Sequence, residues 1–380
     1  MEFRDLKKQY EMIEDEIQEG MKTVIRDCNF ISGRQVDVLE GKLAEYVGAK
    51  HCITCANGTD ALSLALMAWK IGEGDAVFVP DFTFFSSGEV VSYAGATPVF
   101  VDIDKDTFNI SVDSLENAIQ CVIEEGYLTP KVIIAVDLFG QPADYPSIRK
   151  IAEKYNLMIL EDGAQGFGGE IEGQKACSFG NISTTSFFPA KPLGCYGDGG
   201  AVFTDNDDIE KYLRSIRIHG KGSCKYDNIR IGMNSRLDTL QAAILLPKLK
   251  AFEKYELEKI NQAAAQYTEI LKDVVKTPFI KEGFYSSWAQ YSVLLPENIQ
   301  REELQQNLKR DDIPTMVYYP KPMHEQKAFL DNYLVFDELS NTKEICRRIL
   351  SLPIHPYMKS EDVEYVAECL KKYLCPDTLY

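Results

Sequence analysis

One stretch of the chain places a lysine in surroundings that make an amine reactive. Lys191 follows an apolar run, lies between Pro189 and Pro192, and precedes the glycine-rich segment Gly197-Asp198-Gly199-Gly200. Glycines allow the backbone to approach a ligand closely. A desolvated lysine loses its proton more easily and can attack a carbonyl group to form a Schiff base. A surface lysine with a buried stem fits the same pattern, so other parts of the chain must decide between the two interpretations.

Three further groups follow predicted strands and could serve the same chemistry. Asn57-Gly58-Thr59-Asp60 lies between a strand and a helix, where backbone N–H groups and a hydroxyl suit a phosphate. A plain helix cap by the threonine or the aspartate is the alternative. Asp162 follows an apolar strand, and a buried carboxylate needs a partner, either a protonated ring nitrogen or an arginine. Phe84 could stack on a flat cofactor or pack in the core. With Lys191, these groups are what pyridoxal phosphate requires.

The elements that would position these groups alternate along the chain. Short apolar runs predict strands over 51–55, 76–79, 99–101, 132–136 and 157–160. Helices are expected over 59–69, from an N-cap at Asp113 to a stop at Gly126, and over 146–155. This alternation favours an α/β fold with a mostly parallel sheet, and such sheets bind ligands at the carboxyl ends of their strands. We expect a large domain over 1–248 and a smaller α+β domain over 249–380.

Composition narrows the classes of partner. The net charge of the 380 residues is −17, which argues against nucleic acid as a ligand. The first residues are charged and no apolar run approaches membrane-spanning length, so we expect a cytoplasmic protein without a membrane partner. Ten cysteines in such a protein are expected to be reduced thiols. The four histidines form no close cluster, so no metal site is expected.

Ordered motifs along nearly the whole chain resemble the DegT/DnrJ/EryC1/StrS family of nucleotide-sugar aminotransferases. That resemblance implies the fold-type-I aminotransferase architecture, with a mixed, mostly parallel sheet between helices, and pyridoxal 5'-phosphate as cofactor. The motifs that carry it are Phe3-Arg4-Asp5-Leu6-Lys7, Ala56-Asn57-Gly58-Thr59-Asp60-Ala61-Leu62, Val79-Pro80-Asp81-Phe82-Thr83-Phe84, Leu138-Phe139-Gly140-Gln141, Glu161-Asp162-Gly163-Ala164-Gln165, Ser186–Gly200 and Asn234-Ser235-Arg236-Leu237-Asp238.

The resemblance also implies roles at matching positions. Lys191 would bind the cofactor covalently, and Asp162 would pair with the pyridine nitrogen. The remaining implied cofactor residues are Gly58, Thr59 and Ser186 at the phosphate, Asp60 in the same turn, Gln165 at the ring hydroxyl, Phe84 on the ring, and Asn234 at the phosphate of a neighbouring subunit. Implied substrate residues are Arg236, Tyr318, Tyr319, His324 and His355. Active sites shared across a homodimer interface follow from the same resemblance.

Segments around Lys191 and over 235–249 and 351–357 are similar to family members that aminate C3 of a ketosugar. The implied reaction transfers the amino group of L-glutamate to a nucleotide-linked 3-ketosugar in surface-polysaccharide synthesis. UDP-2-acetamido-2-deoxy-3-oxo-glucuronate is the expected substrate. A dTDP-3-oxo-6-deoxyhexose, a C4-ketosugar, or a non-catalytic regulator or scaffold of the same fold are the alternatives. The family usually has alanine where this chain has Gly163, and we expect the change to loosen the packing under the ring.

Overall fold

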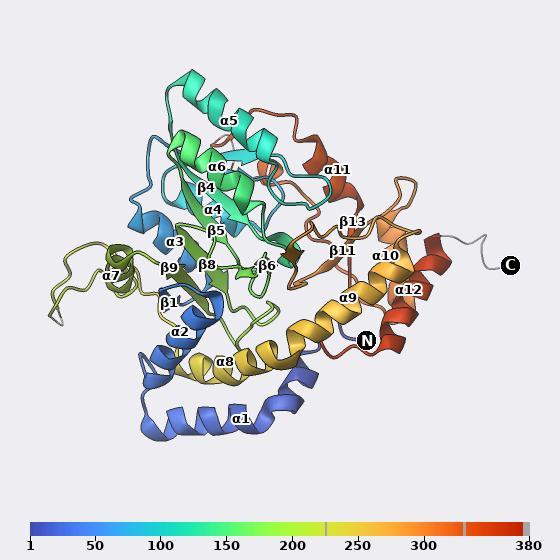
Figure 1. Ribbon diagram of the computed structural model, residues 1–380, viewed down its shortest axis with the longest axis horizontal. Helices are drawn as coiled ribbons and strands as arrows, with labels where there is room; N and C mark the ends of the chain where they lie inside the picture. Colours follow the sequence, from blue (N-terminus) through green and yellow to red (C-terminus); the bar gives the residue numbers. More distant parts are fainter. Residues whose placement is uncertain (225, 330–331, 375–380) are drawn as a thin grey trace.

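A central sheet runs through the computed structural model, which describes residues 1–224, 226–329 and 332–374 (Figure 1). The strands are β1 (His51–Cys55), β2 (Asp75–Pro80), β3 (Thr97–Val101), β4 (Thr129–Val136), β5 (Met158–Asp162), β6 (Glu170–Ile171), β7 (Gln174–Lys175), β8 (Ile182–Ser186), β9 (Gly200–Thr204), β10 (Phe284–Tyr285), β11 (Tyr291–Leu294), β12 (Leu334–Val335) and β13 (Ile349–Leu352). The large sheet has the order β1-β9-β8-β5-β4-β2-β3-β12. Its pairs from β8 to β12 are parallel, whereas β1–β9 and β9–β8 are antiparallel. The sheet is therefore mixed and mostly parallel, as predicted.

Helices cover both faces of this sheet. They are α1 (Leu6–Asp27), α2 (Arg34–Val47), α3 (Gly58–Ala68), α4 (Ser86–Tyr93), α5 (Val112–Glu125), η1 (Leu138–Gly140), α6 (Tyr145–Tyr155), α7 (Asp207–Ile216), α8 (Thr239–Ala251), η2 (Phe252–Glu256), α9 (Leu257–Leu271), α10 (Arg301–Arg310), η3 (Met323–Glu325), α11 (Ser340–Arg348) and α12 (Ser360–Leu374). Helices α3, α4 and α7 pack on one face, and α5, α6, α2 and α8 on the other.

Strand β2 explains why the central strands are apolar throughout. Val77 and Val79 face the α3 side, while Ala76 and Phe78 face the α5 side. All four are buried, because a parallel sheet covered on both faces leaves no side of a central strand in water. The chain therefore forms a three-layer α/β arrangement, and the turns after the strands gather at one edge of the sheet.

Two helix starts differ from the sequence expectation. Helix α5 is capped by Ser111, whose side chain accepts a hydrogen bond from the N–H of Ser114, and Asp113 lies inside the first turn. Both residue types cap helices well, and the earlier one begins the helix here. Helix α3 is capped by Asn57, which accepts from the N–H of Asp60 at 2.8 Å. The hydroxyl of Thr59 is thus not the cap.

The C-terminal part has its own core around the β11–β13 pair, covered by α9, α10 and α12. Strand β12 nevertheless returns to pair with β3 at the edge of the large sheet. Helix α8 continues through the π-helical segment η2 into α9, and α1 lies beside α8 (Figure 1). The domain boundary at residue 248 falls within α8 and stays a prediction.

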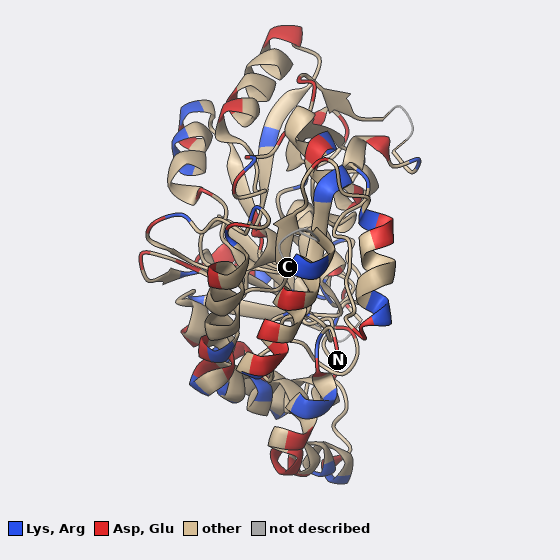
Figure 2. Cartoon of the chain, turned by 90° about the vertical axis from the view of Figure 1, so that its right-hand side faces the viewer, with Lys and Arg blue, Asp and Glu red and all other residues tan. Residues whose placement is uncertain are grey.

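Acidic and basic positions, coloured red and blue on the ribbon of Figure 2, alternate along the helices of this view. Among the described residues, none of the helices combines the length and apolar character that crossing a bilayer demands. The expectation that the chain binds no nucleic acid stays a prediction.

Candidate active site

A cavity of about 450 Å³ opens where the strands of the large sheet end. It brings together most residues that the sequence singled out, although they come from positions 57 to 319. The lining residues are Asn57, Gly58, Thr59, Leu62, Thr83, Phe84, Ser86, Val136, Asp162, Ala164, Gln165, Ser186, Phe188, Ala190, Lys191, Asp198, Gln290, Tyr318 and Tyr319. Within the described parts of the chain, Lys191 is the one lysine or arginine on this lining. The cavity is therefore the candidate active site.

Lys191 lies in a tight loop between β8 and β9. The N–H of Lys191 donates to the carbonyl of Phe188 at 2.9 Å, and the two ends of the loop are tied where the N–H of Cys195 donates to the carbonyl of Phe187 at 2.7 Å. The Lys191 Nζ lies 6.0 Å from the centroid of the Phe84 ring. Burial lowers the pKa of Lys191 to about 8, with Asp162 opposing that shift. A substantial fraction of this amine is therefore free base near neutral pH, as a nucleophile requires.

Asp162 ends β5 with its side chain only 5% exposed. One carboxylate oxygen accepts from the Ser87 hydroxyl at 2.7 Å, and the other accepts from the N–H of Ala164 at 3.2 Å. Burial raises the pKa of Asp162, and the bond from Ser87 and the charge of Lys191 oppose that rise. No ion pair within 4.0 Å is formed by Asp162 among the described residues. A buried carboxylate held in this way suits a cationic partner inside the cavity.

Gln165 connects the turn after β5 to the C-terminal part. Its amide oxygen accepts from the N–H of Phe139 at 2.8 Å, and its amide nitrogen donates to the hydroxyl of Tyr319 at 3.0 Å. The ring of Tyr319 lies 6.0 Å from Phe82 and 6.2 Å from Phe84, centroid to centroid. Aromatic rings and an amide therefore form one wall of the cavity.

The start of α3 forms a polar cup opposite that wall. A Cβ at Gly58 would lie 2.7 Å from the Cβ of Ser186, so only glycine lets the helix start approach β8 this closely. The hydroxyls of Thr59 and Ser86 lie 2.7 Å apart and both line the cavity. Backbone N–H groups of a helix N-terminus with three hydroxyls around them make a suitable phosphate site.

Five predicted site residues do not line the cavity. Asp60 lies in the first turn of α3, and Asn234 is exposed and pairs through its backbone with Ile218. Arg236 lies two residues further along, partly exposed. Their predicted roles are untested by the single chain, since Asn234 and Arg236 were assigned to a neighbouring subunit or its interface.

The two predicted substrate histidines have protein partners instead. The ring Nδ1 atom of His324 lies 2.7 Å from one carboxylate oxygen of the fully buried Asp81. The backbone N–H of His324 donates to the other oxygen of Asp81 at 2.8 Å. Burial lowers the pKa of His355 to about 4, and its Nδ1 accepts from the N–H of Tyr357. His324 therefore ties η3 to the end of β2, whereas the bond at His355 is local, and the predicted substrate roles of both histidines stay predictions.

Sequence reasoning missed several residues at the cavity. Ser86 and Ser87 directly follow the aromatic segment at Phe84, so their position was a usable signal. Gln290 and Asp198 also line the cavity. Asp198 lies inside the glycine-rich segment after Lys191, whereas nothing in the local pattern of Gln290 indicates a site.

Gly163 does not loosen the packing under the cavity, contrary to expectation. A Cβ at Gly163 would lie 2.7 Å from the Sγ of Cys177 and 3.0 Å from the carbonyl oxygen of Thr184. Cys177 is fully buried and occupies the space that an alanine at 163 would need. The cysteine compensates for the missing methyl group.

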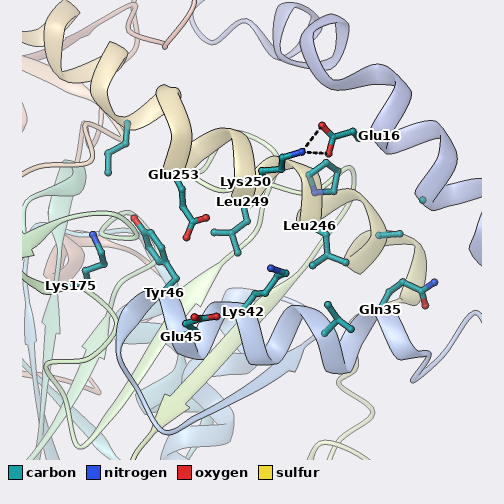
Figure 3. A pocket seen from close by; sticks show the side chains of 15 residues that line it. Glu16, Gln35, Lys42, Glu45, Tyr46, Lys175, Leu246, Leu249, Lys250 and Glu253 are labelled. Carbon is teal, nitrogen blue, oxygen red and sulfur yellow. Dashed lines mark hydrogen bonds and ion pairs between the residues drawn. The ribbon is translucent and has the colours of Figure 1, made fainter.

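A larger groove of about 890 Å³ lies elsewhere, between α1, α2 and α8 (Figure 3). Its charged residues sit near water: the Nζ of Lys250 lies 3.0 Å from a carboxylate oxygen of Glu16, with side-chain exposures of 66% and 53%. Tyr46 at its far end packs against Lys175, whose Nζ lies 4.8 Å from the ring centroid. None of the sequence-predicted site residues lines this groove.

A mostly parallel α/β sheet with a buried lysine and a buried carboxylate at its strand ends has the place and the groups for a ligand site. The chain belongs to the DegT/DnrJ/EryC1/StrS aminotransferase family, which matches residues 11–371. It is an aminotransferase by this membership.

Individual relatives match over almost their whole length. The chain is 44% identical to the UDP-2-acetamido-2-deoxy-3-oxo-D-glucuronate aminotransferase of Pseudomonas aeruginosa, over 97% of this chain and 99% of that protein. It is 40% identical to the pleiotropic regulatory protein of Geobacillus stearothermophilus, over 97% of both. A crystal structure of a family aminotransferase from Brucella abortus superposes with a TM-score of 0.96 at 47% identity, covering 99% of this chain and 100% of that one.

Proposed function

We propose that this chain transfers the amino group of L-glutamate to C3 of UDP-2-acetamido-2-deoxy-3-oxo-glucuronate, with pyridoxal 5'-phosphate bound at Lys191. The single observation that carries the proposal is the placement of Lys191 and Asp162 in one cavity. Besides these two, the charged side chain on the described lining is that of Asp198. The identity to the Pseudomonas aeruginosa enzyme supports the sugar.

The residues present fit the cofactor. Gly58 leaves the space between α3 and β8 that a phosphate cup needs, because any Cβ there would collide with Ser186. The buried carboxylate of Asp162 is oriented by Ser87 and forms no ion pair in the described chain, so a protonated pyridine nitrogen is a matching partner. Phe84 is 53% exposed beside Lys191, as a ring that stacks on a ligand would be.

Each of these residues has a physical task. Pyridoxal phosphate, when bound, supplies the electron sink for breaking a bond at the substrate carbon. The Nζ of Lys191 accepts and returns a proton at that carbon, for which its lowered pKa of about 8 is well matched. Ser87 fixes the orientation of Asp162, and Asp162 holds a positive charge at the ring nitrogen. Tyr319 and Gln165 close the wall and exclude water.

A second copy of the chain would complete the site. A nucleotide diphosphate sugar with a carboxylate carries several negative charges, whereas the lining contributes the single lysine described above. Phe84 and Phe188, each 53% exposed, leave apolar surface at the cavity. We propose that Asn234 and Arg236 of a neighbouring copy reach this cavity. Mixing a Lys191→Ala variant with an Arg236→Ala variant should then restore activity that neither has alone.

A non-catalytic regulator is the second candidate, and the name of the Geobacillus stearothermophilus relative favours it. A regulator would not need an amine with a lowered pKa facing an oriented carboxylate. Under this alternative, Lys191→Ala would leave the biological effect of the protein unchanged.

The deciding experiment follows the visible absorbance of the cofactor-loaded protein. Adding UDP-2-acetamido-3-amino-2,3-dideoxy-glucuronate, the proposed product, should bleach the cofactor band, and 2-oxoglutarate should restore it. Bleaching by glutamate but not by the amino sugar would retain the aminotransferase and exclude the uronate; a dTDP-linked 6-deoxy sugar or a C4-amino sugar would be tried next. A protein that binds no cofactor would support the regulator.

A further inference from the structure

Arg4, in the short arm before α1, touches the backbone of the lysine loop. Its Nη2 donates to the carbonyl oxygen of Lys191 at 3.2 Å, across 187 positions of sequence. Its Nη1 donates to the carbonyl oxygen of Ala289 at 3.4 Å, just before β11 of the C-terminal part. One guanidinium thus joins the N-terminal arm, the lysine loop and the C-terminal part.

The arm itself is firmly anchored. Asp5 caps α1 by accepting from the N–H of Lys8 at 2.8 Å, so Arg4 directly precedes a fixed helix start. Helix α1 then buries Ile13 and Ile17 against Ile244 of α8. Arg4 therefore approaches the lysine loop from a rigid element.

A buried carboxylate, that of Glu256, interacts electrostatically with Arg4. Glu256, at the end of η2, is 2% exposed and accepts from the Gln9 amide at 2.9 Å and from the Tyr357 hydroxyl. Burial lowers the pKa of Arg4, while the charge of Glu256 opposes that shift. Because a guanidinium stays protonated in proteins, Arg4 remains a permanent positive charge at this position.

We propose that Arg4 is a positioning residue of the active site, which fixes the Lys191 backbone and keeps a permanent positive charge behind the Lys191 amine. The functional meaning of this proposal rests on the proposed role of Lys191 as the cofactor lysine. Arginine suits the task because its planar fork reaches two carbonyl groups at once, which a lysine ammonium cannot do with the same geometry.

The charges around the amine explain why such a residue is useful. Asp162 faces Lys191 from β5 and favours its protonated form, whereas burial and Arg4 favour the free amine. The other titratable side chains of the lining are Asp198, Tyr318 and Tyr319. Asp162 must stay ionised to hold a ring nitrogen, yet its charge would keep the lysine protonated and unreactive. Burial offsets most of that effect, and the charge of Arg4 adds to the offset without joining the lining of the cavity.

The test measures the protonation of Lys191 in cofactor-free protein. Brief acetylation with acetic anhydride across a pH series, followed by mass spectrometry of the Lys191 peptide, gives the pH midpoint of the amine. The series compares the parent with Arg4→Gln, Arg4→Lys and Lys8→Gln. Lys8→Gln is the matched control, since it removes the same charge four residues further on, in the first turn of α1, where among the described residues the Lys8 ammonium pairs with Glu11 at the surface.

Arg4→Gln should raise the midpoint, so that acetylation of Lys191 at pH 7 slows measurably relative to the parent. Arg4→Lys should stay near the parent because it keeps the charge, and Lys8→Gln should match the parent. An unchanged midpoint in Arg4→Gln would overturn the proposal. An equal rise in Arg4→Gln and Arg4→Lys would also overturn it, because loosening of the loop, and not charge, would then set the titration.

Loss of Arg4 removes one of the two positive charges that act on the buried Glu256, the other being Lys248, and could lower stability. The double variant Arg4→Gln/Glu256→Gln removes both charges and should show the same raised midpoint. Since no cofactor or sugar enters this measurement, its result is separate from the absorbance test of the proposed function. Cofactor binding by the parent with no shift in either variant would keep the function and reject the role of Arg4.

Discussion

Two hollows of the described chain, the groove between α1, α2 and α8 and the cavity at Lys191, differ in how strongly their charged side chains are buried. The groove between α1, α2 and α8 has about twice the volume of the cavity at Lys191. In the groove, Lys250 and Glu16 pair in open solvent, where water screens their interaction. In the cavity, burial shifts the pKa of Lys191 down and that of Asp162 up. Desolvation of facing groups, more than volume, distinguishes a reactive site.

Two lysines of α8 show the same contrast at close range. Lys250 points into the groove and is 66% exposed, whereas Lys248 is 1% exposed (Figure 3). The Nζ of Lys248 has no hydrogen-bond partner in the described chain and lies 4.7 Å from the ring centroid of Tyr196. Burial lowers the pKa of Lys248 to about 8. The same helix therefore carries one lysine whose charge is solvated and another whose charge is disfavoured by burial.

The largest effect is expected when the cavity loses its amine. Lys191→Ala should lower kcat about 10⁴-fold, because it removes both the attachment point and the acid–base group. Lys250→Ala, the matched change in the groove, should leave kcat unchanged. Steady-state transamination assays on both variants, with circular dichroism to verify folding, test this. Retained multiple turnovers in Lys191→Ala would remove the distinction between the two hollows.

The charge of Asp162 is expected to matter next. Asp162→Asn keeps the volume and an oxygen that can accept from Ser87, but loses the negative charge. We expect kcat to fall about 10²- to 10³-fold, the range for loss of one oriented electrostatic group. Single-turnover reaction of the cofactor-loaded variant with glutamate is the measurement. Glu16→Gln in the groove is the control, and a loss of less than tenfold in Asp162→Asn would argue against a pairing with the ring nitrogen.

Much of this cavity was predictable because its residues follow strands. Apolar runs located β1, β2 and β5, and the polar residues after them had to meet at one edge of the sheet. The segment around Lys191 marked it as a candidate, whereas the choice between a reactive and a surface lysine needed the other motifs, and its role stays a prediction. Ser87 and Arg4 were not assigned, since their contacts to Asp162 and Lys191 span 75 and 187 positions. A single sequence predicts which residues are buried more readily than it predicts which side chains contact one another in the folded chain.

Other details could not be predicted because neighbouring residues offered equally good local solutions. Ser111 and Asp113 are both good helix caps, and only the packing of α5 decides that the helix begins after Ser111. The effect of glycine in place of alanine at position 163 could not be predicted either. It depends on Cys177, which lies on a different segment and fills the space beside Gly163. The contact of His324 with Asp81 was also not foreseen, while its predicted role at the sugar stays a prediction.

Lys248→Met is expected to stabilise the protein, unlike Lys250→Met. The pKa of Lys248 is lowered from 10.5 to about 8 by burial, so the folded state resists its charge. The parent therefore gains stability as pH rises between about 8 and 10.5, because the unfolded chain binds more protons there. Methionine has similar length and no charge, and should add on the order of 2–3 kcal/mol at pH 7.

That gain should shrink as pH approaches 10.5, where the lysine of the folded parent is neutral and half of the unfolded chains have also lost the proton. Urea unfolding of the parent and both variants at pH 7 and pH 10 gives the comparison. A stability difference of equal size at both values would mean that packing, and not the charge of Lys248, causes it.

The smallest effect concerns the wall of the cavity. Tyr319→Phe removes the hydroxyl that accepts from the Gln165 amide at 3.0 Å but keeps the ring that lies 6.2 Å from Phe84. One neutral hydrogen bond contributes about 1 kcal/mol, which corresponds to roughly a fivefold change in binding. We therefore expect the KM for the amino sugar to rise about fivefold and kcat to change less. Tyr46→Phe beside the groove should change neither constant. A large drop in kcat for Tyr319→Phe would instead place its hydroxyl at the reacting atoms, and the cavity would then hold a second proton-transfer group besides Lys191.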